Sequence, residues 1–376
     1  MLLMHKNEPV ADLNMYLNRV LSVNAVYRLE LMPWGTEVSS PFLLPKAIDA
    51  WQAGRSIPKE RQDVHKIEER LGCSVSQALY QSLGVSLTDC YWYKENGSDL
   101  QWEDVTFYGK DFSEDFYRIA IAGENVKEIN FHGPDYTTDG VLKKAWLNID
   151  GIPTLIKFGN LGEKANNKNL LSANEIAAYR ISELMGINHA QYYPVKIAET
   201  GEFACATPTF ISDDKHEFIN GLSYGKHEKM TFDLYNLFVK NGMQSDVDKM
   251  IVFDFMIHNT DRHEKNFGVL RDSDTFELIG FAPLFDSGSS FFWNNDKNFT
   301  KPFKDDRFEQ LSLVEKMPCD IPGHQEVENI LQGSYELFGI EERIFDSAVK
   351  DLNSSYKTLR NFEHNIFLED REDAEL

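Results

Sequence analysis

One polar stretch stands in an apolar context, DFMIHNTDRHEKNFGVL at residues 254–270. It holds Asp261 and Asn266 five residues apart, and Asp286 follows twenty residues after Asn266 in APLFDSGSS. Their oxygen atoms are the ligands that Mg²⁺ prefers, and an aspartate can also accept the proton of an attacking hydroxyl. Asx turns would account for one such residue, but they leave three in this order unexplained. The spacing indicates a catalytic loop for phosphoryl transfer.

Two residues further upstream complete the set that this chemistry needs. Lys157 closes the strand-like segment LIKF, and Glu175 lies near the start of the helical segment SANEIAAYRISELMG at 172–186. A lysine can hold the α- and β-phosphates of ATP, and a helix acid can orient that lysine. Each residue also has a simpler interpretation. Lys157 fits an ordinary strand end, and Glu175 fits a capping box with Ser172.

The elements that must position these residues change in type along the chain. Asp150-Gly151 separates two strand-like runs, which predicts a hairpin over 142–158. Thr200-Gly201 predicts a second hairpin over 190–211, and FGVLRDSDTFELIGF a third over 267–281. A helix is expected over 245–259 with Ser245 as its cap. Strands followed by helices favour an α+β fold with two lobes.

The first 125 residues read as a mainly helical extension. Pro58 precedes KERQDVHKIEERLG, which spaces Val64, Ile67 and Leu71 on one face and stops at Gly72. The expected division is a helical extension at 1–125, an ATP-binding lobe at 126–212, a helical catalytic lobe at 213–368 and an acidic tail at 369–376.

Charge and composition narrow the classes of partner. The 376 residues include 38 Lys and Arg against 60 Asp and Glu, a formal charge of −22. Phosphate backbones require a basic surface, so no direct nucleic-acid partner is expected. The chain has no apolar run of membrane-spanning length and no signal-peptide pattern, so no membrane association and a cytoplasmic location are expected. The four dispersed cysteines are expected to be free thiols.

The blocks NTDRHEKNFGVL and APLFDSG resemble the catalytic and metal-binding loops of HipA-like serine/threonine kinases. The stretch YTTDGVLKKAW, the LIKF strand and the helix NEIAAYRISELMGI fit the ATP lobe of that family. The resemblance covers roughly residues 125 to 350. Residues 1–125, with RSIPKER and GVSLTDCYW, resemble the leader of a Gram-positive branch and not the small β-domain of the founding toxin.

The resemblance implies a bilobal protein-kinase-like fold and Mg²⁺-ATP-dependent phosphorylation of a protein Ser or Thr. It makes Asp261 the catalytic base and Asn266 and Asp286 the magnesium ligands. The residues implied in nucleotide binding are Lys157, Glu175, Gly140, Lys144, His263 and the hinge Phe210, Ile211 and Ser212. Thr137 or Thr138 is expected to be a regulatory autophosphorylation site. The family also suggests a toxin–antitoxin system, with an antitoxin protein as a partner.

Other functions use part of the same residue set. A metal-dependent hydrolase could place His258, Asp261, His263 and Asp286 around one ion, but that leaves the upstream lysine and helix acid unexplained. A small-molecule or lipid kinase would use the same ATP machinery. A nucleotide-binding pseudokinase or interaction module would have no need of a base at Asp261.

Overall fold

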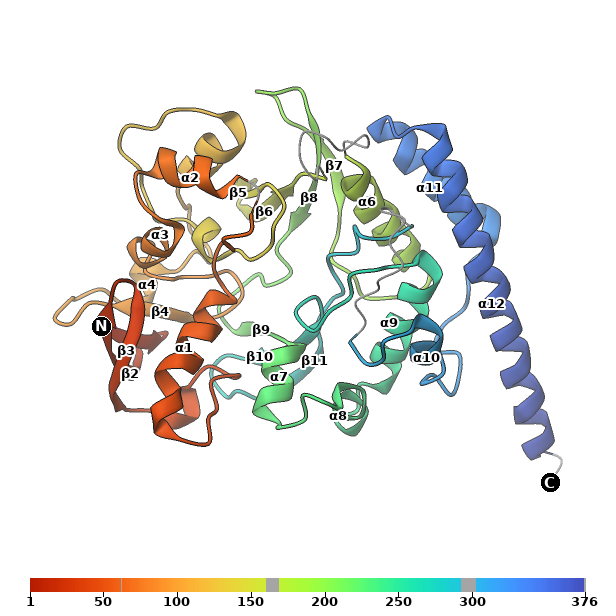
Figure 1. The fold of residues 1–376 in the computed structure, drawn as a ribbon, viewed down its shortest axis with the longest axis horizontal. Coiled ribbons are helices and arrows are strands. Elements are labelled where there is room, and N and C mark those ends of the chain that lie inside the picture. Colours follow the sequence, from red (N-terminus) through yellow and green to blue (C-terminus); the bar gives the residue numbers. More distant parts are fainter. Residues whose placement is uncertain (62, 160–168, 292–301, 375–376) are drawn as a thin grey trace.

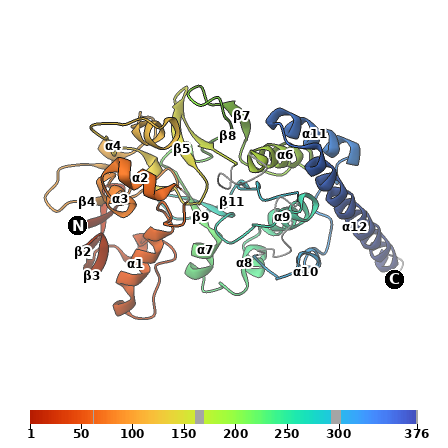
Figure 2. The same ribbon diagram turned by 45° about the horizontal axis from the view of Figure 1, so that its top comes forward.

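The computed structural model describes residues 1–61, 63–159, 169–291 and 302–374, which contain three antiparallel sheets flanked by helices (Figure 1). The N-terminal elements lie at one end of the molecule, and helices α11 (His324–Phe338) and α12 (Glu342–Ala374) lie at the other (Figures 1 and 2). The helix α12 runs on to Ala374, so the expected acidic tail is largely the end of this helix. None of the described helices is long and apolar enough to cross a membrane.

The N-terminal region contains a sheet that the sequence reading missed. Its four strands pair in the order β3-β2-β1-β4, with bounds β1 (Leu2–His5), β2 (Glu8–Tyr16), β3 (Arg19–Val26) and β4 (Tyr91–Lys94). Leu17 and Asn18 both have positive φ, 47° and 60°, in the two-residue turn between β2 and β3. Asn tolerates that backbone, but leucine in this conformation is uncommon, and the usual Gly signal is absent. The prediction of a mainly helical extension was therefore wrong for residues 2–26.

Helices fill the rest of this region, with bounds α1 (Leu44–Ala53), α2 (Val64–Leu71), α3 (Val75–Gln81), α4 (Trp102–Val105) and α5 (Asp115–Tyr117). The predicted apolar stripe of α2 is confirmed, because Val64, Ile67 and Leu71 are all buried. Gly72 ends the helix with φ 68°, a conformation that glycine adopts at low cost. Ser74 caps α3 by accepting a hydrogen bond from the Gln77 N–H.

The second sheet carries the lysine-bearing strand. Its order is β5-β6-β8-β7, with bounds β5 (Lys144–Ile149), β6 (Ile152–Lys157), β7 (Tyr193–Lys196) and β8 (Phe203–Pro208). Both predicted hairpins are confirmed. Asp150 and Gly151 have φ 52° and 83° at the first turn, as a two-residue hairpin loop requires. Helix α6 (Leu170–Leu184) packs against this sheet and against α11.

The third sheet follows the linker 209–215 and has the order β11-β10-β9, with bounds β9 (His216–Asn220), β10 (Gly268–Asp272) and β11 (Leu278–Phe281). The β10–β11 hairpin confirms the prediction over 267–281. Helices surround it, namely α7 (Gly221–His227), α8 (Leu234–Lys240), α9 (Gln244–Ile257) and α10 (Arg307–Leu311). The helix α9 begins at Gln244, so Ser245 lies inside it and is not its cap.

Two hydrophobic clusters cross the expected domain boundaries. One joins Ile67 of α2 and Ala78 of α3 to Ile156 and Ala206 of the second sheet. The other joins α6, α9, α11 and α12. Burial of apolar surface is the main stabilising term in folding, so these segments depend on one another for their cores.

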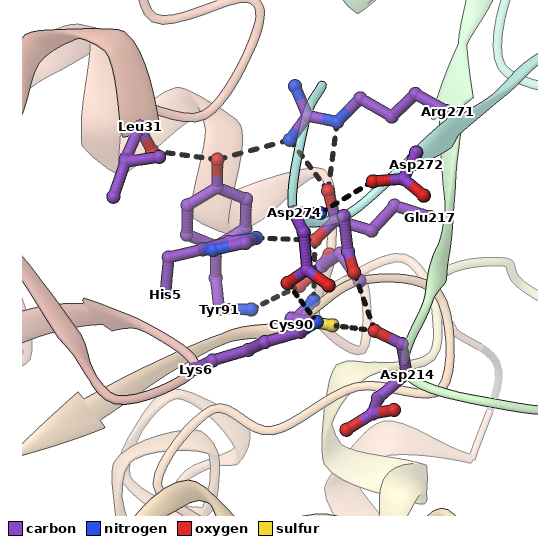
Figure 3. A network of polar contacts seen from close by, with 12 residues as sticks. His5, Lys6, Leu31, Cys90, Tyr91, Asp214, Glu217, Arg271, Asp272 and Asp274 are labelled. Carbon is purple, nitrogen blue, oxygen red and sulfur yellow. Dashed lines mark hydrogen bonds and ion pairs between the residues drawn. The ribbon is translucent and has the colours of Figure 1, made fainter. Parts of the chain in front are cut away.

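A buried polar network joins the N-terminal sheet to β9 and β10 (Figure 3). The Oε1 atom of Glu217 accepts hydrogen bonds from the Cys90 N–H at 2.7 Å and lies 3.0 Å from the His5 Nε2 atom. The Arg271 guanidinium donates to Oε2 at 2.8 Å and to the Tyr91 hydroxyl at 3.1 Å. Burial would raise the pKa of Glu217, but Arg271 and His5 outweigh it and lower the pKa to about 2. The buried carboxylate of Glu217 therefore stays charged, and it is bonded to groups on both sides of the junction.

Candidate active site

Lys157 lies where the second sheet, α6 and the loop after β11 meet. Its ammonium group donates hydrogen bonds to Glu175 Oε1 and Asp286 Oδ1. The helix α6 begins at Leu170, so Ser172 and Glu175 lie inside it and the capping-box interpretation was wrong. Glu175 is fully buried, and its other oxygen accepts from the Ser287 N–H at 2.8 Å. The fold thus brings Glu175, 18 residues after Lys157, and Asp286, 129 residues after it, into one ion-pair cluster with the lysine.

The charges in this cluster support one another. Burial alone would lower the pKa of Lys157, but the carboxylates of Asp286 and Glu175 raise it well above its ordinary value. Burial would likewise raise the pKa of Asp286, and the ammonium groups of Lys157 and Lys144 hold it well below its usual range. The site therefore keeps a charged lysine and a charged aspartate at neutral pH.

The catalytic-loop candidates lie between α9 and β10. The side-chain amide of Asn266 donates to the carbonyl of Asp261 at 3.0 Å, and the Asp261 N–H donates to Asn259 Oδ1 at 3.1 Å. These bonds fold the loop back on itself, so both side chains leave it on the same short turn. Burial and the nearby Asp286 raise the pKa of the Asp261 carboxyl. A raised pKa makes Asp261 a stronger proton acceptor while it remains ionised.

Arg262 organises this loop, a role that the sequence reading did not assign. It is fully buried and donates to both oxygens of Asp254 on α9, at 2.9 and 3.2 Å. It also donates to the carbonyls of Asn266 and Phe285, at 2.8 and 2.7 Å. One guanidinium thus fixes the Asp261 loop relative to the Asp286 loop. An arginine beside Asp261 in an apolar context was the available signal.

The loop that carries Asp286 has an uncommon backbone. Asp286 has φ 58°, a left-handed conformation that few residues other than glycine adopt. Its neighbour Ser287 is held by Arg262 Nη2 at 3.1 Å and lies 3.1 Å from His189 Nε2. Burial lowers the pKa of His189 to about 4, so this imidazole stays neutral. Supported local strain of this kind is typical of functional positions.

The loop before β5, residues 138–143, contains Gly140 and is called the glycine loop here; it contacts the catalytic loop, residues 259–266, through Lys265 and Asp139. Gly140 has φ 108°, and the space that a Cβ atom would need there is taken by the Lys144 side chain. The Lys144 ammonium is buried and donates to the Asp139 carbonyl. The Lys265 ammonium, from between Asp261 and Asn266, donates to Asp139 Oδ2 at 3.0 Å. The loop therefore touches the catalytic residues' own segment.

Thr137 and Thr138 are both engaged. Thr137 is buried, and its hydroxyl can donate to the Val85 carbonyl at 2.8 Å or to the Pro134 carbonyl at 3.0 Å. The Thr138 hydroxyl donates to Pro134 at 2.9 Å and accepts from the indole of Trp146 at 2.8 Å. A phosphate on Thr137 would require this segment to leave its present place.

The expected hinge coincides with the linker between β8 and β9. Phe210 packs against Phe218 and Phe285, with its ring centroid 5.7 and 5.8 Å from theirs. Phe285 directly precedes Asp286 in the sequence. Ile211 is buried and Ser212 is exposed. An apolar wall beside a charged cluster suits a ligand with a base at one end and phosphates at the other.

The hydrolase alternative does not fit this geometry. The Nδ1 atom of His258 lies 2.6 Å from a guanidinium nitrogen of Arg307. This Nδ1 atom is therefore poorly placed to hold a metal cation. His263 is half-buried, and its Nδ1 accepts from the Lys265 N–H at 3.3 Å. Over the described ranges, the one group of three ligand atoms within 4.8 Å of one another is His5, Cys90 and Glu217. Both oxygens of Glu217 already accept hydrogen bonds there, so that group is accounted for by its polar network.

The donor set suits a hard divalent cation. Asp286 and Asn266 both offer oxygen atoms, and the Asp286 side chain is 42% exposed. These two residues fit Mg²⁺, which binds few protein oxygens and keeps other positions for water or phosphate.

Comparison with known proteins gives the relatives of this arrangement. A family model for the HipA-like C-terminal domain matches residues 137–352, more than half of the chain. No curated protein matches the sequence. Among solved structures, the Helicobacter pylori proinflammatory kinase CtkA is 16% identical with a TM-score of 0.48, over 60% of this chain and 94% of that one. HipA of Shewanella oneidensis MR-1, solved with HipB and operator DNA, is 13% identical with a TM-score of 0.46, over 98% and 90%. The chain belongs to the family with a HipA-like C-terminal domain, and its fold, with three antiparallel sheets and surrounding helices, is of the α+β class.

Proposed function

We propose that this protein is a Mg²⁺-dependent kinase that transfers the γ-phosphate of ATP to a Ser or Thr hydroxyl of a protein. The observation that carries the proposal is the ion-pair cluster of Lys157 with Glu175 and Asp286, set beside the Asp261–Asn266 loop. Membership of a family of kinase-like proteins supports it.

Each residue has a role that its surroundings suit. Lys157, oriented by Glu175, holds the α- and β-phosphates. Asp261 lies half-buried with a raised pKa, and it accepts the proton of the attacking hydroxyl. Asp286 and Asn266 would hold Mg²⁺, which supplies neutralisation of the charge on the phosphates. Phe210 and the linker beside it hold the adenine.

The proposal extends to regulation and partners. Thr137 or Thr138 accepts a phosphate in autophosphorylation. Because the Thr137 hydroxyl is buried, its phosphorylation would displace residues 134–138 from their present position. Family membership supports a toxin role with an antitoxin partner, which copurification from the native host tests. All four cysteines are unpaired, which agrees with a reducing cytoplasm.

Incubation with Mg²⁺ and γ-labelled ATP tests the activity directly. The purified protein should gain phosphate, and intact mass with phosphopeptide mapping should place it on Thr137 or Thr138. Label on neither threonine in active enzyme would remove the autophosphorylation site but keep the kinase. Nucleotide binding without transfer to any protein, with transfer to lipid or small-molecule acceptors, would reassign the substrate class. Absence of Mg²⁺-dependent nucleotide binding would overturn the proposal.

Nucleotide affinity should fall as pH rises through 8. Burial and the nearby ammonium group of Lys157 together lower the pKa of Lys144 to about 8. The ammonium form, which attracts phosphate, is therefore dominant below pH 8 and about tenfold outnumbered at pH 9. ATP titrations at pH 7, 8 and 9 should show the Kd rising by up to roughly tenfold between pH 7 and pH 9, in step with loss of the ammonium form. Lys144→Arg keeps its charge over this range, so its Kd should stay nearly constant. Equal pH dependence in both proteins would contradict the role of Lys144.

A further inference from the structure

Asp139, in the glycine loop, accepts hydrogen bonds from three donors. Its Oδ1 atom accepts from the Gly140 N–H at 2.7 Å. Its Oδ2 atom accepts from the Lys265 ammonium at 3.0 Å, across 126 residues of sequence. Its backbone carbonyl accepts from the buried ammonium of Lys144. One backbone N–H and two ammonium groups therefore converge on a single aspartate.

These donors have the composition of a phosphate site. A backbone N–H beside a glycine with positive φ, together with lysine ammonium groups, is what nucleotide-binding loops present to phosphate oxygens. Gly140 has φ 108° and lacks the Cβ that would collide with Lys144, so the loop can hold both groups close. A carboxylate matches a phosphate in charge sign and in accepting such hydrogen bonds.

We infer that Asp139 is an internal anion that competes with nucleotide phosphates for their donors, and that Lys265 is a further phosphate-binding residue. The inference rests on the proposed function and goes beyond it. Nucleotide phosphates compete with the Asp139 carboxylate for the Gly140 N–H and for Lys265. The contact is therefore autoinhibitory, and it links the glycine loop to the catalytic loop until a nucleotide takes its place.

The exposure of the pair makes this exchange feasible. The side chains of Lys265 and Asp139 are 43% and 36% exposed, so the ion pair is screened by water and contributes little to folding. An interaction that is weak in this way can be broken by a ligand with several negative oxygens. Lys157, by contrast, is nearly fully buried against two carboxylates. The exposed Asp139–Lys265 ion pair is thus easier to break than the buried Lys157 cluster.

Replacing Asp139 tests the competition. Asp139→Ala should lower the Kd for ATP and ADP by about threefold to tenfold, because a larger fraction of the protein is then free to bind. Asp139→Asn, which can still accept hydrogen bonds, should give a smaller change in the same direction. Adenosine has no phosphates, so its Kd should not change. Asp150→Asn, an exposed aspartate in the β5–β6 turn, controls for the lost charge.

Lys265→Met provides the second arm. It should weaken ATP and ADP binding and leave adenosine binding unchanged. Lys240→Met, at an exposed position of α8, should leave the binding of all three unchanged. In the double variant, the gain from Asp139→Ala should shrink, because part of it acts through Lys265. Calorimetry with Mg²⁺ measures each Kd, and thermal melts check folding.

The outcomes separate the two proposals. Tighter phosphate-selective binding in Asp139→Ala supports the internal anion. Unchanged or weaker ATP binding there, with wild-type protein binding ATP normally, overturns the inference but keeps the kinase. Equal tightening for adenosine also overturns it, since the effect would not involve phosphates. If wild-type protein and all variants fail to bind any nucleotide, the proposed function fails and the inference fails with it.

Discussion

The Asp261→Asn protein should transfer phosphate about 10²- to 10⁴-fold more slowly than wild type while binding ATP with similar affinity. The amide cannot accept the hydroxyl proton, so the loss falls on kcat. Asparagine keeps the shape of the side chain, and the loop is held by the Asp261 backbone through Asn259 and Asn266. Single-turnover transfer and ATP calorimetry on the same samples separate rate from binding.

Glu264→Gln is the matched control for this change. Glu264 belongs to the same loop and loses one negative charge, but its side chain has no place in the proposed chemistry. It should therefore retain near wild-type transfer. Wild-type activity in Asp261→Asn would remove Asp261 as the base. Loss of ATP binding would point to a collapsed loop.

The Arg271→Leu protein should unfold with a free energy about 3–5 kcal/mol below that of wild type. Arg271 and Glu217 are both fully buried, and removal of the guanidinium leaves a carboxylate in the core with His5 as its remaining side-chain partner. Urea titration followed by fluorescence and far-ultraviolet circular dichroism gives the difference. Arg343→Leu breaks the exposed pair with Glu341 and should change stability by less than about 1 kcal/mol.

The same pair predicts a pH dependence. The pKa of Glu217 is lowered to about 2 in the folded protein, so its contribution to stability is present above the ordinary carboxyl range and is lost as pH falls towards 2. Wild type should therefore lose more stability than Arg271→Leu between about pH 5 and pH 2. Parallel curves for the two proteins would mean that Arg271 does not hold the proton off Glu217.

The local elements of the two lobes could be predicted because short-range chemistry decides them. Asp150-Gly151 allows the left-handed turn that the first hairpin needs, and Val64, Ile67 and Leu71 share one helical face. The order of Lys157, Asp261, Asn266 and Asp286 could be read as a kinase arrangement, and the fold brings Lys157 to Asp286. The roles of the hinge, loop and metal residues stay predictions.

Other features depend on partners distant in sequence. The β2–β3 turn at Leu17-Asn18 carries no glycine, so its left-handed backbone is set by the strands it joins. Helix α6 starts two residues before the Ser172 that the sequence suggested as its cap. Arg262 and Arg271 read as surface residues by composition, yet both are fully buried because Asp254 and Glu217 meet them.

The network around Glu217 also bears on how the N-terminal region can vary among related chains. Glu217 and Arg271 belong to the family-matched segment, but His5, Cys90 and Tyr91, which complete their hydrogen bonds, lie before it. An exchanged N-terminal segment would have to offer an equivalent set of polar groups at the same depth, or leave charge buried without partners. The N-terminal sheet is therefore no interchangeable module: recombination between relatives is constrained to inherit both sides of this junction together.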